Sequence, residues 1–169
     1  LVFVLVSLAA PPSVGRLDRL LAVAWDSGAR PVVVLTKADL AEGTAAAERD
    51  EVAETAGPAP VLLTSTVDGR GLAELRAMVG PGTTAALLGV SGAGKSSLRT
   101  ALGGGSAPVA AVGRTGKGRH TTAYRNLVLL PGGGAVLDTP GIRGVGLLDT
   151  AEGLDRAFAD VADLSERCR

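Results

Sequence analysis

The sequence predicts a doubly wound α/β domain with a mostly parallel, six-stranded sheet. Three observations support this fold class. Short runs of Val, Leu and Ala recur along the chain, stretches with helical spacing of apolar residues separate most of them, and a glycine-rich loop joins one run to a helix. Apolar residues make up 46% of the 169 residues, which is enough for one core and indicates a single domain. Because only 2% are aromatic, Val, Leu and Ala must fill that core.

The first half of the chain is expected to alternate strands with helices. Between residues 14 and 27 apolar residues recur at helical spacing, and Gly28 follows them. Val32–Leu35 is the kind of β-branched run that forms a parallel strand covered on both faces. The expected elements are a strand at 2–6, a helix at 14–27, a strand at 32–35, a helix at about 44–55 and a strand at 61–63.

The second half continues this pattern and ends in a hairpin. Residues 103–122 are rich in glycine and small residues without an apolar period, which predicts a long mobile loop. Pro131–Gly134 is typical of a hairpin turn. The expected elements are a helix at 72–78, a strand at 84–88, a helix at 97–102, strands at 124–130 and 135–137, and a last helix at about 151–166.

A phosphate-binding loop lies at the centre of the chain. Residues 89–97 read GVSGAGKSS and match the pattern G-x-x-x-x-G-K-[ST], with an apolar run before it and a helix after it. In that context glycines let the backbone approach phosphates, Lys95 reaches the β- and γ-phosphates, and the Ser96 hydroxyl holds Mg²⁺. The alternative is a Gly-rich helix N-terminus without a ligand. The predicted phosphate contacts are Gly89, Val90, Ser91, Gly92, Ala93, Gly94, Lys95, Ser96 and Ser97.

The strand at 32–35 is followed by Thr36, Lys37, Ala38 and Asp39, which we predict to bind a guanine base. The Asp39 carboxylate can accept hydrogen bonds from N1–H and from the 2-amino group of guanine, a pair that adenine does not offer. Each such bond contributes roughly 1.5 to 3 kcal/mol, so the preference reaches a factor of about a hundred. Lys37 would cover the base or brace the phosphate loop. The alternative role of Asp39 is an ordinary helix cap.

Three further loops would complete the site. After the strand at 61–63, backbone N–H groups of Ser65 and Thr66 would meet the guanine oxygen. The strand at 135–137 is followed by Asp138, which would hold Mg²⁺ through water, and by Gly141, whose N–H would reach the γ-phosphate. In the long loop, Thr121 or Thr122 would close over Mg²⁺ when the γ-phosphate is present.

These five loops occur in a rearranged order. Ordinary GTPases run phosphate loop, switch threonine, D-x-x-G, [NT]-K-x-D and serine loop, whereas this chain begins with the TKAD loop at residues 36–39. The loops would still gather at one rim of the sheet, because only the connections between strands have been rerouted. The sequence therefore predicts a circularly permuted P-loop GTPase domain that binds GTP, GDP and Mg²⁺.

The permuted order, the phosphate loop, GRHTT at 118–122 and DTPGI at 138–142 together resemble the RsgA (YjeQ) family of ribosome small-subunit-dependent GTPases. The resemblance covers essentially the whole chain. Permuted GTPases that act on the large subunit are similar in order, but usually have Asn where this chain has Gly92. Thr36 also departs from the commoner Asn, which predicts a weaker tie between base loop and phosphate loop and a lower nucleotide affinity.

The resemblance also implies further modules. The family has an OB-fold before this domain and a zinc-binding module after it. We therefore expect an excised fragment, in which residues 1–167 form the permuted GTPase domain, residues 168–169 begin a truncated zinc-binding module and the N-terminal OB-fold is absent. Cys168 would be a Zn²⁺ ligand only in the full-length protein, and in this fragment it would be a spare surface thiol.

The activity implied by the resemblance is GTP hydrolysis in late maturation of the small ribosomal subunit, stimulated by that subunit and its rRNA. Ile142 stands where Ras-like GTPases have the glutamine that orients water, so intrinsic turnover should be at or below roughly 10⁻³ to 10⁻⁴ per second. We predict that His120 positions the water and that Lys95 is also catalytic. A solvent-facing loop position or an RNA phosphate contact are the alternatives for His120.

Three other functions remain open at this stage. The chain could be a nucleotide-gated rRNA-binding module with incidental hydrolysis, a permuted GTPase acting on the large subunit, or an ATP-using P-loop enzyme. The global charge favours none of them, because 17 Lys and Arg balance 17 Asp and Glu. From Arg76 to Leu137, however, the chain has Lys and Arg but no acidic residue, which phosphates or an RNA-facing surface would explain.

The remaining expectations concern the environment of the protein. One Cys and one His cannot form an internal disulfide or a tetrahedral zinc site, which fits a reducing cytoplasm. Leu1–Ala10 is apolar but far shorter than a membrane span and is followed by two prolines. We expect a cytoplasmic protein without a membrane partner, and a monomeric isolated domain.

Overall fold

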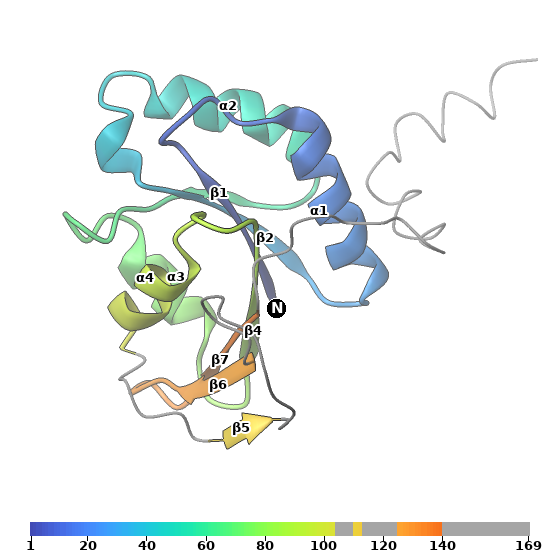
Figure 1. Ribbon diagram of the computed structural model, residues 1–169, viewed down its shortest axis with the longest axis vertical. Helices are drawn as coiled ribbons and strands as arrows, with labels where there is room; N and C mark the ends of the chain where they lie inside the picture. Colours follow the sequence, from blue (N-terminus) through green and yellow to red (C-terminus); the bar gives the residue numbers. More distant parts are fainter. Residues whose placement is uncertain (104–109, 113–124, 140–169) are drawn as a thin grey trace, which may run out of the picture.

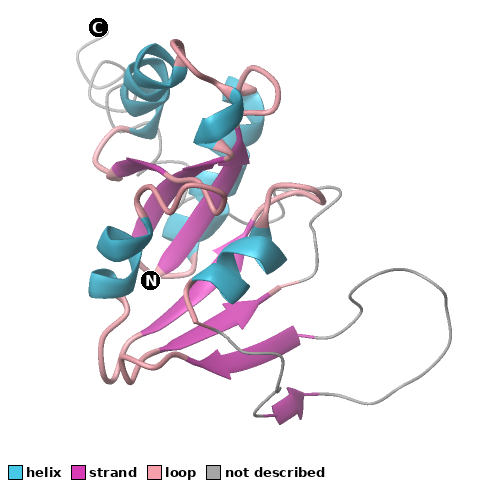
Figure 2. Cartoon of the chain, turned by 90° about the vertical axis from the view of Figure 1, so that its left-hand side faces the viewer, coloured by secondary structure: helices cyan, strands magenta, loops and turns pink. Residues whose placement is uncertain are grey.

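The computed structural model describes residues 1–103, 110–112 and 125–139, in which a sheet lies between two pairs of helices (Figures 1 and 2). The predicted helices and strands in these ranges are present, with ends shifted by no more than a few residues. The elements are β1 (Val2–Ser7), α1 (Val14–Asp26), β2 (Pro31–Thr36), the 3₁₀ helix η1 (Ala38–Leu40), α2 (Ala45–Ala56), β3 (Val61–Leu63), α3 (Leu72–Met78), β4 (Thr84–Leu88), α4 (Lys95–Ala101), β5 (Ala110–Val112), β6 (Arg125–Leu129) and β7 (Ala135–Asp138).

The sheet has the order β3-β2-β1-β4-β7-β6-β5. Neighbouring strands among β3, β2, β1, β4 and β7 pair in parallel. Strand β6 pairs antiparallel with both β7 and β5. The chain leaves β1 toward β2 and β3, then returns to β4 on the other side of β1 and continues to β7. The loops after β1 and β4 therefore diverge, which opens a crevice beyond the carboxyl ends of these strands.

The mostly parallel α/β sheet with an antiparallel edge is confirmed, but its described part has seven strands where six were predicted. The added strand is β5, whose residues Ala110–Val112 lie inside the stretch predicted as a loop. Its three small residues carry no periodic signal. The strand is specified by its partner, because Ala110 to Val112 pair with Leu127 to Arg125 of β6. The rest of the predicted loop and the predicted helix at 151–166 lie outside the described residues.

The core is divided between the two faces of the sheet. Alternate residues of β1 point to opposite faces, so that Val2 and Val4 pack with α1 and α2 whereas Phe3 and Leu5 pack with α3 and α4. Both faces are covered, which explains why the central strands are continuous apolar runs. None of the helices in the described ranges has the length and hydrophobicity of a transmembrane segment.

Candidate nucleotide-binding site

The loops that leave β2, β4 and β7 meet at one edge of the sheet, because the three strands run in the same direction. Two side chains link these loops. The hydroxyl of Thr36, the last residue of β2, donates to the Ala93 carbonyl in the phosphate loop at 2.8 Å. The Ser96 hydroxyl donates to Asp138 Oδ2 at the end of β7 at 3.4 Å. Residues 36–39, residues 89–97 and Asp138 are thus neighbours, although they lie far apart in the sequence.

The phosphate loop needs glycine for two different reasons. A Cβ at Gly89 would lie 2.9 Å from the Leu5 carbonyl oxygen of β1, so a side chain there would overlap fixed backbone. Gly92 and Gly94 have φ of +82° and +91°, a region that favours glycine. Together they turn the chain from β4 into α4, which begins at Lys95.

Lys95 is held over the phosphate loop. Its Nζ donates to the carbonyls of Gly89 at 2.8 Å and Val90 at 2.9 Å, and the residue is only 8% exposed. Burial lowers the pKa of Lys95 below its usual value, and the nearby charge of Asp138 partly opposes this change. A cation placed out of water acts strongly on an anion that enters the same loop.

The base loop is shaped by a left-handed residue. Lys37 has φ of 60° and ψ of 38°, and it is the one non-glycine residue with positive φ in the described ranges. The turn that follows is η1, and its first N–H, that of Ala38, donates to the Thr64 carbonyl at 3.0 Å. This contact fixes the loop after β2 against the loop after β3. The sequence did not predict η1 because the segment has only three residues.

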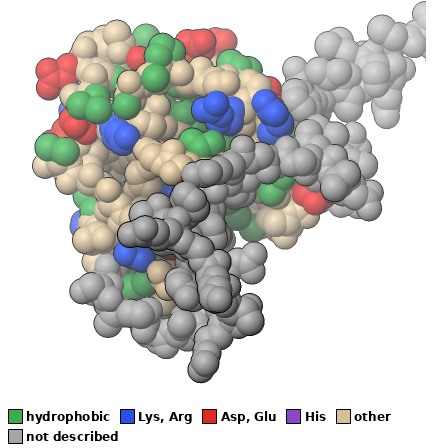
Figure 3. All heavy atoms as spheres, in the orientation of Figure 1, with side chains coloured by type: hydrophobic (Ala, Val, Ile, Leu, Met, Phe, Trp, Pro, Cys, Tyr) green, Lys and Arg blue, Asp and Glu red, His purple; other side chains and the backbone are tan. Residues whose placement is uncertain are grey.

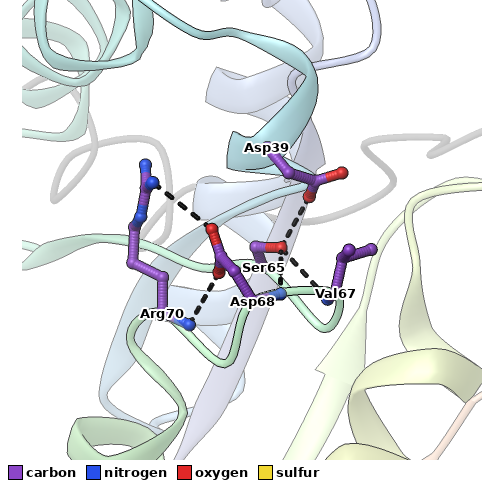
Figure 4. A network of polar contacts seen from close by, with 5 residues as sticks. All are labelled: Asp39, Ser65, Val67, Asp68 and Arg70. Atoms are coloured by element: carbon purple, nitrogen blue, oxygen red, sulfur yellow. Dashed lines mark hydrogen bonds and ion pairs between the residues drawn. The ribbon is translucent and has the colours of Figure 1, made fainter.

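Asp39 belongs to a network formed by these two loops (Figure 4). The Ser65 hydroxyl donates to Asp39 Oδ1 at 2.6 Å, and the same hydroxyl accepts the N–H groups of Val67 and Asp68 at 3.1 and 3.4 Å. Asp39 lies inside η1 and is not at the N-cap position of η1 or of α2, since Lys37 and Thr44 occupy those positions. The structure therefore contradicts the helix-cap alternative for Asp39.

Neighbouring residues keep the end of this network in place. The Asp68 carboxylate accepts the N–H of Arg70 at 2.9 Å and its guanidinium at 3.3 Å. The backbone hydrogen bond from Arg70 is the main cause that holds the pKa of Asp68 below its usual value. Asp68 is exposed, so its charge faces water and is separate from the buried part of the site.

Ser65 enters the site differently from the prediction. Its N–H, predicted to meet the guanine oxygen, donates to the Arg70 carbonyl at 3.0 Å, so it is the hydroxyl that contacts Asp39. Thr66 is exposed, and its predicted contact stays a prediction. A small polar residue just after a strand was the sequence signal for Ser65, but the pattern did not indicate which of its donors acts.

The predicted Mg²⁺ ligands Ser96 and Asp138 lie side by side, and Asp138 is 2% exposed. A buried carboxylate beside a phosphate-loop hydroxyl fits Mg²⁺, which usually takes one or two protein oxygens and completes its shell with water and phosphate. No cluster of three His, Cys, Asp or Glu side chains occurs within the described ranges, and Mg²⁺ needs none. Sequence reasoning missed Arg99, whose NH1 lies 3.5 Å from Asp138 Oδ2.

A cavity of about 250 Å³ opens beside the phosphate loop. Residues 90–93 form one wall, and the connection from β1 to α1 with Arg16 forms the other. Neither Asp39 nor Asp138 lines this cavity, so it is not the predicted base pocket. The predicted site residues His120, Thr121, Thr122, Gly141 and Cys168 lie outside the described residues.

A family model described as RsgA GTPase matches residues 1–148. The chain belongs to the RsgA GTPase family. A curated relative, the small ribosomal subunit biogenesis GTPase RsgA of Streptomyces coelicolor, is 54% identical over 98% of this chain. The match covers 46% of that relative, so the chain spans about half the length of the RsgA proteins it matches.

Two solved structures share the RsgA fold. The crystal structure of YjeQ from Thermotoga maritima has a TM-score of 0.70 and 27% identity, covering 94% of this chain and 55% of that one. The structure of YloQ, described as a circularly permuted GTPase, has a TM-score of 0.69 and 28% identity, covering 99% and 54%. The predicted permuted α/β fold is thereby confirmed.

Proposed function

We propose that this chain is the GTP-binding and GTP-hydrolysing domain of a factor in late maturation of the small ribosomal subunit, and that the subunit stimulates its turnover. The observation that carries the proposal is the meeting of Asp39, Lys95 and Asp138 at one edge of the sheet. The Streptomyces coelicolor relative, named as a small ribosomal subunit biogenesis GTPase, supports the choice of partner.

In this proposal each loop has a separate task. Asp39 accepts the two guanine donors and keeps lone pairs free for them while Ser65 fixes its Oδ1. Residues 89–97 cradle the phosphates, and Lys95 neutralises the β- and γ-phosphates as charge develops during hydrolysis. Ser96 and Asp138 would hold Mg²⁺, which would supply positive charge to stabilise the phosphate groups.

The residues after β7 and in the long loop would complete catalysis. Thr121 or Thr122 would add a ligand for Mg²⁺, and the Gly141 N–H would donate to the γ-phosphate. Because Ile142 cannot hydrogen-bond water, we assign the orientation or deprotonation of water to His120. His120→Ala should then reduce subunit-stimulated turnover and leave GTP affinity unchanged. Unaltered stimulated turnover would remove His120 from catalysis.

The test of the proposed function is GTP turnover by the full-length protein with and without small ribosomal subunits. We expect slow turnover alone and a large increase with small subunits, but not with large subunits. Lys95→Ala is the control, because it should abolish turnover under both conditions. Equal turnover with and without small subunits would contradict the proposed partner and leave the nucleotide site untouched.

A nucleotide-gated RNA-binding module is a second candidate, supported by the distribution of charge. The stretch 76–137 has no acidic residue, whereas α2 carries several. Figure 3 shows acidic side chains at the top of the view, where α2 lies. Acidic groups repel rRNA phosphates, so rRNA would contact the protein away from α2. Release from the subunit that proceeds equally with a non-hydrolysable GTP analogue would favour this candidate over the enzyme.

The family resemblance supports three further proposals about the whole protein. Residues 1–167 would form the GTPase domain, and an OB-fold would precede this domain in the full-length protein. Cys168 would be the first Zn²⁺ ligand of a module that follows the domain. The protein would act in the cytoplasm, where the small subunit matures. The isolated domain would be a monomer, which light scattering of the purified domain would check.

A further inference from the structure

Arg99 places a second cation beside the buried carboxylate of Asp138. It lies on α4 three residues after Ser96 and four after Lys95, so the three side chains share one face of the helix. Arg99 NH1 is 3.5 Å from Asp138 Oδ2, the same oxygen that accepts the Ser96 hydroxyl. The arginine and the predicted Mg²⁺ ligand from the phosphate loop therefore approach one carboxylate oxygen.

The Arg99–Asp138 pair is shielded from water. The Asp138 side chain is 3% exposed and the Arg99 side chain 20%. The buried Nε of Arg99 has no hydrogen-bond partner within the described ranges, so that atom does not anchor the guanidinium elsewhere. An ion pair with so little contact with solvent is weakly screened by salt.

A divalent cation that enters this site meets a carboxylate whose charge is already balanced. Lys95 interacts electrostatically with Asp138, and the Arg99 guanidinium lies 3.5 Å from Asp138 Oδ2. Unlike Lys95, which sits in the phosphate loop and whose charge phosphates would neutralise, Arg99 stands one helical turn further along α4. Its repulsion of Mg²⁺ therefore persists when nucleotide binds.

We propose that Arg99 competes with Mg²⁺ for Asp138 and so raises the Mg²⁺ concentration that the domain needs to retain a guanine nucleotide. Arg99 is a positioning residue in this scheme, because it acts through Asp138 and touches neither the base nor the reacting phosphate. The inference rests on the proposed nucleotide and Mg²⁺ site. It makes nucleotide release sensitive to free Mg²⁺, which would help the protein exchange GDP for GTP.

The experiment measures the release rate of a fluorescent GDP analogue from the full-length protein at a series of free Mg²⁺ concentrations. Arg99→Met removes the charge and keeps the length of the side chain. We expect the Mg²⁺ concentration that half-maximally slows release to fall roughly threefold to tenfold, from the Coulomb term of one charge at partly screened distance. Arg99→Lys keeps a cation and should stay near the wild-type value.

Arg76→Met is the matched control. Its guanidinium donates to the Ala101 carbonyl at the end of α4, so the substitution removes the same charge from the same neighbourhood without touching Asp138. The Mg²⁺ dependence of this variant should equal that of the wild type. A second neutral variant, Arg99→Gln, retains N–H donors for the buried surroundings. It should show the shift expected of Arg99→Met, and it takes the place of that variant if Arg99→Met folds poorly.

The outcomes separate the inference from the proposed function. An unchanged or higher Mg²⁺ requirement in both neutral variants overturns the role of Arg99 and leaves the Mg²⁺ site standing. A shift of equal size in Arg76→Met also overturns it, because general charge would then suffice. Wild-type release that ignores Mg²⁺ overturns both the Mg²⁺ site and the inference.

Discussion

Thr36 links the end of β2 to the phosphate loop. It is 5% exposed, and its hydroxyl donates to the carbonyls of Ala93 at 2.8 Å and Val6 at 3.4 Å. The replacement of Asn by Thr predicted a weaker tie between the two loops, yet the shorter side chain still makes a direct hydrogen bond across them. The predicted reduction of nucleotide affinity stays a prediction.

Removing the Thr36 hydroxyl tests this link. Thr36→Val keeps the shape and leaves the Ala93 carbonyl without its donor, so we expect the free energy of unfolding to fall by about 1 to 3 kcal/mol. Urea denaturation measures this change. Thr100→Val is the control, since Thr100 is exposed and its hydroxyl donates to the Ser96 carbonyl one turn back on the same helix. Equal stability of the two variants would mean that the Thr36 bond contributes nothing.

In the proposed function, Asp39 selects the base. Asp39→Asn replaces an acceptor of the guanine donors with an amide, so GTP affinity should fall by a factor of roughly ten to a hundred. Affinity for a xanthine nucleotide should rise, because the amide can donate to its 2-oxo group. Asp68→Asn changes a carboxylate of the same network that is exposed and bonded to Arg70, and it should preserve the preference for guanine. Fluorescence competition measures each affinity.

At the scale of elements, the hairpin of β6 and β7 carries Asp138. The position of Asp138 therefore depends on how this hairpin packs against the rest of the molecule. Its turn packs on the chain that leaves α3, where a Cβ on Gly134 would overlap the backbone carbonyl of Val79 and lie 2.7 Å from that of Gly80. The turn therefore needs glycine for close approach. Gly132, in the same turn, has nothing within 4 Å of its Cβ position.

Gly134→Ala should lower the free energy of unfolding by about 2 to 4 kcal/mol, because backbone atoms cannot move aside cheaply. It should also weaken nucleotide binding through the displaced Asp138. Gly132→Ala should be nearly neutral in both measurements. Thermal unfolding with and without GDP and Mg²⁺ compares the two variants. If Gly134→Ala were as stable as Gly132→Ala, the hairpin would not depend on this contact.

The same scale explains which elements the sequence predicts. The helices and the central strands are predicted because each buries a periodic or continuous apolar face. β5 has neither signal, and its pairing with β6 is a contact between distant residues. The 3₁₀ helix after β2 is also missed, since it is set by the left-handed Lys37 and by the bond from Ala38 to Thr64.

For the whole molecule, the positions of the site loops follow from topology. Parallel strands bring their carboxyl ends to one edge, so the order of motifs along the chain can be permuted while the site persists. The loops could thus be predicted from motifs, whereas contacts between them could not. The bonds of Ser65 to Asp39 and of Arg99 to Asp138 depend on side-chain rotamers that no sequence pattern specifies.

The central claim is that loops distant in sequence form one site for a guanine nucleotide. Equilibrium displacement of a fluorescent GDP analogue from the full-length protein, with Mg²⁺ present, tests it most directly. GDP and GTP should displace the analogue at concentrations roughly a hundredfold lower than ATP, because only guanine offers both donors to Asp39. Displacement by ATP at the same concentrations as GTP would contradict the claim.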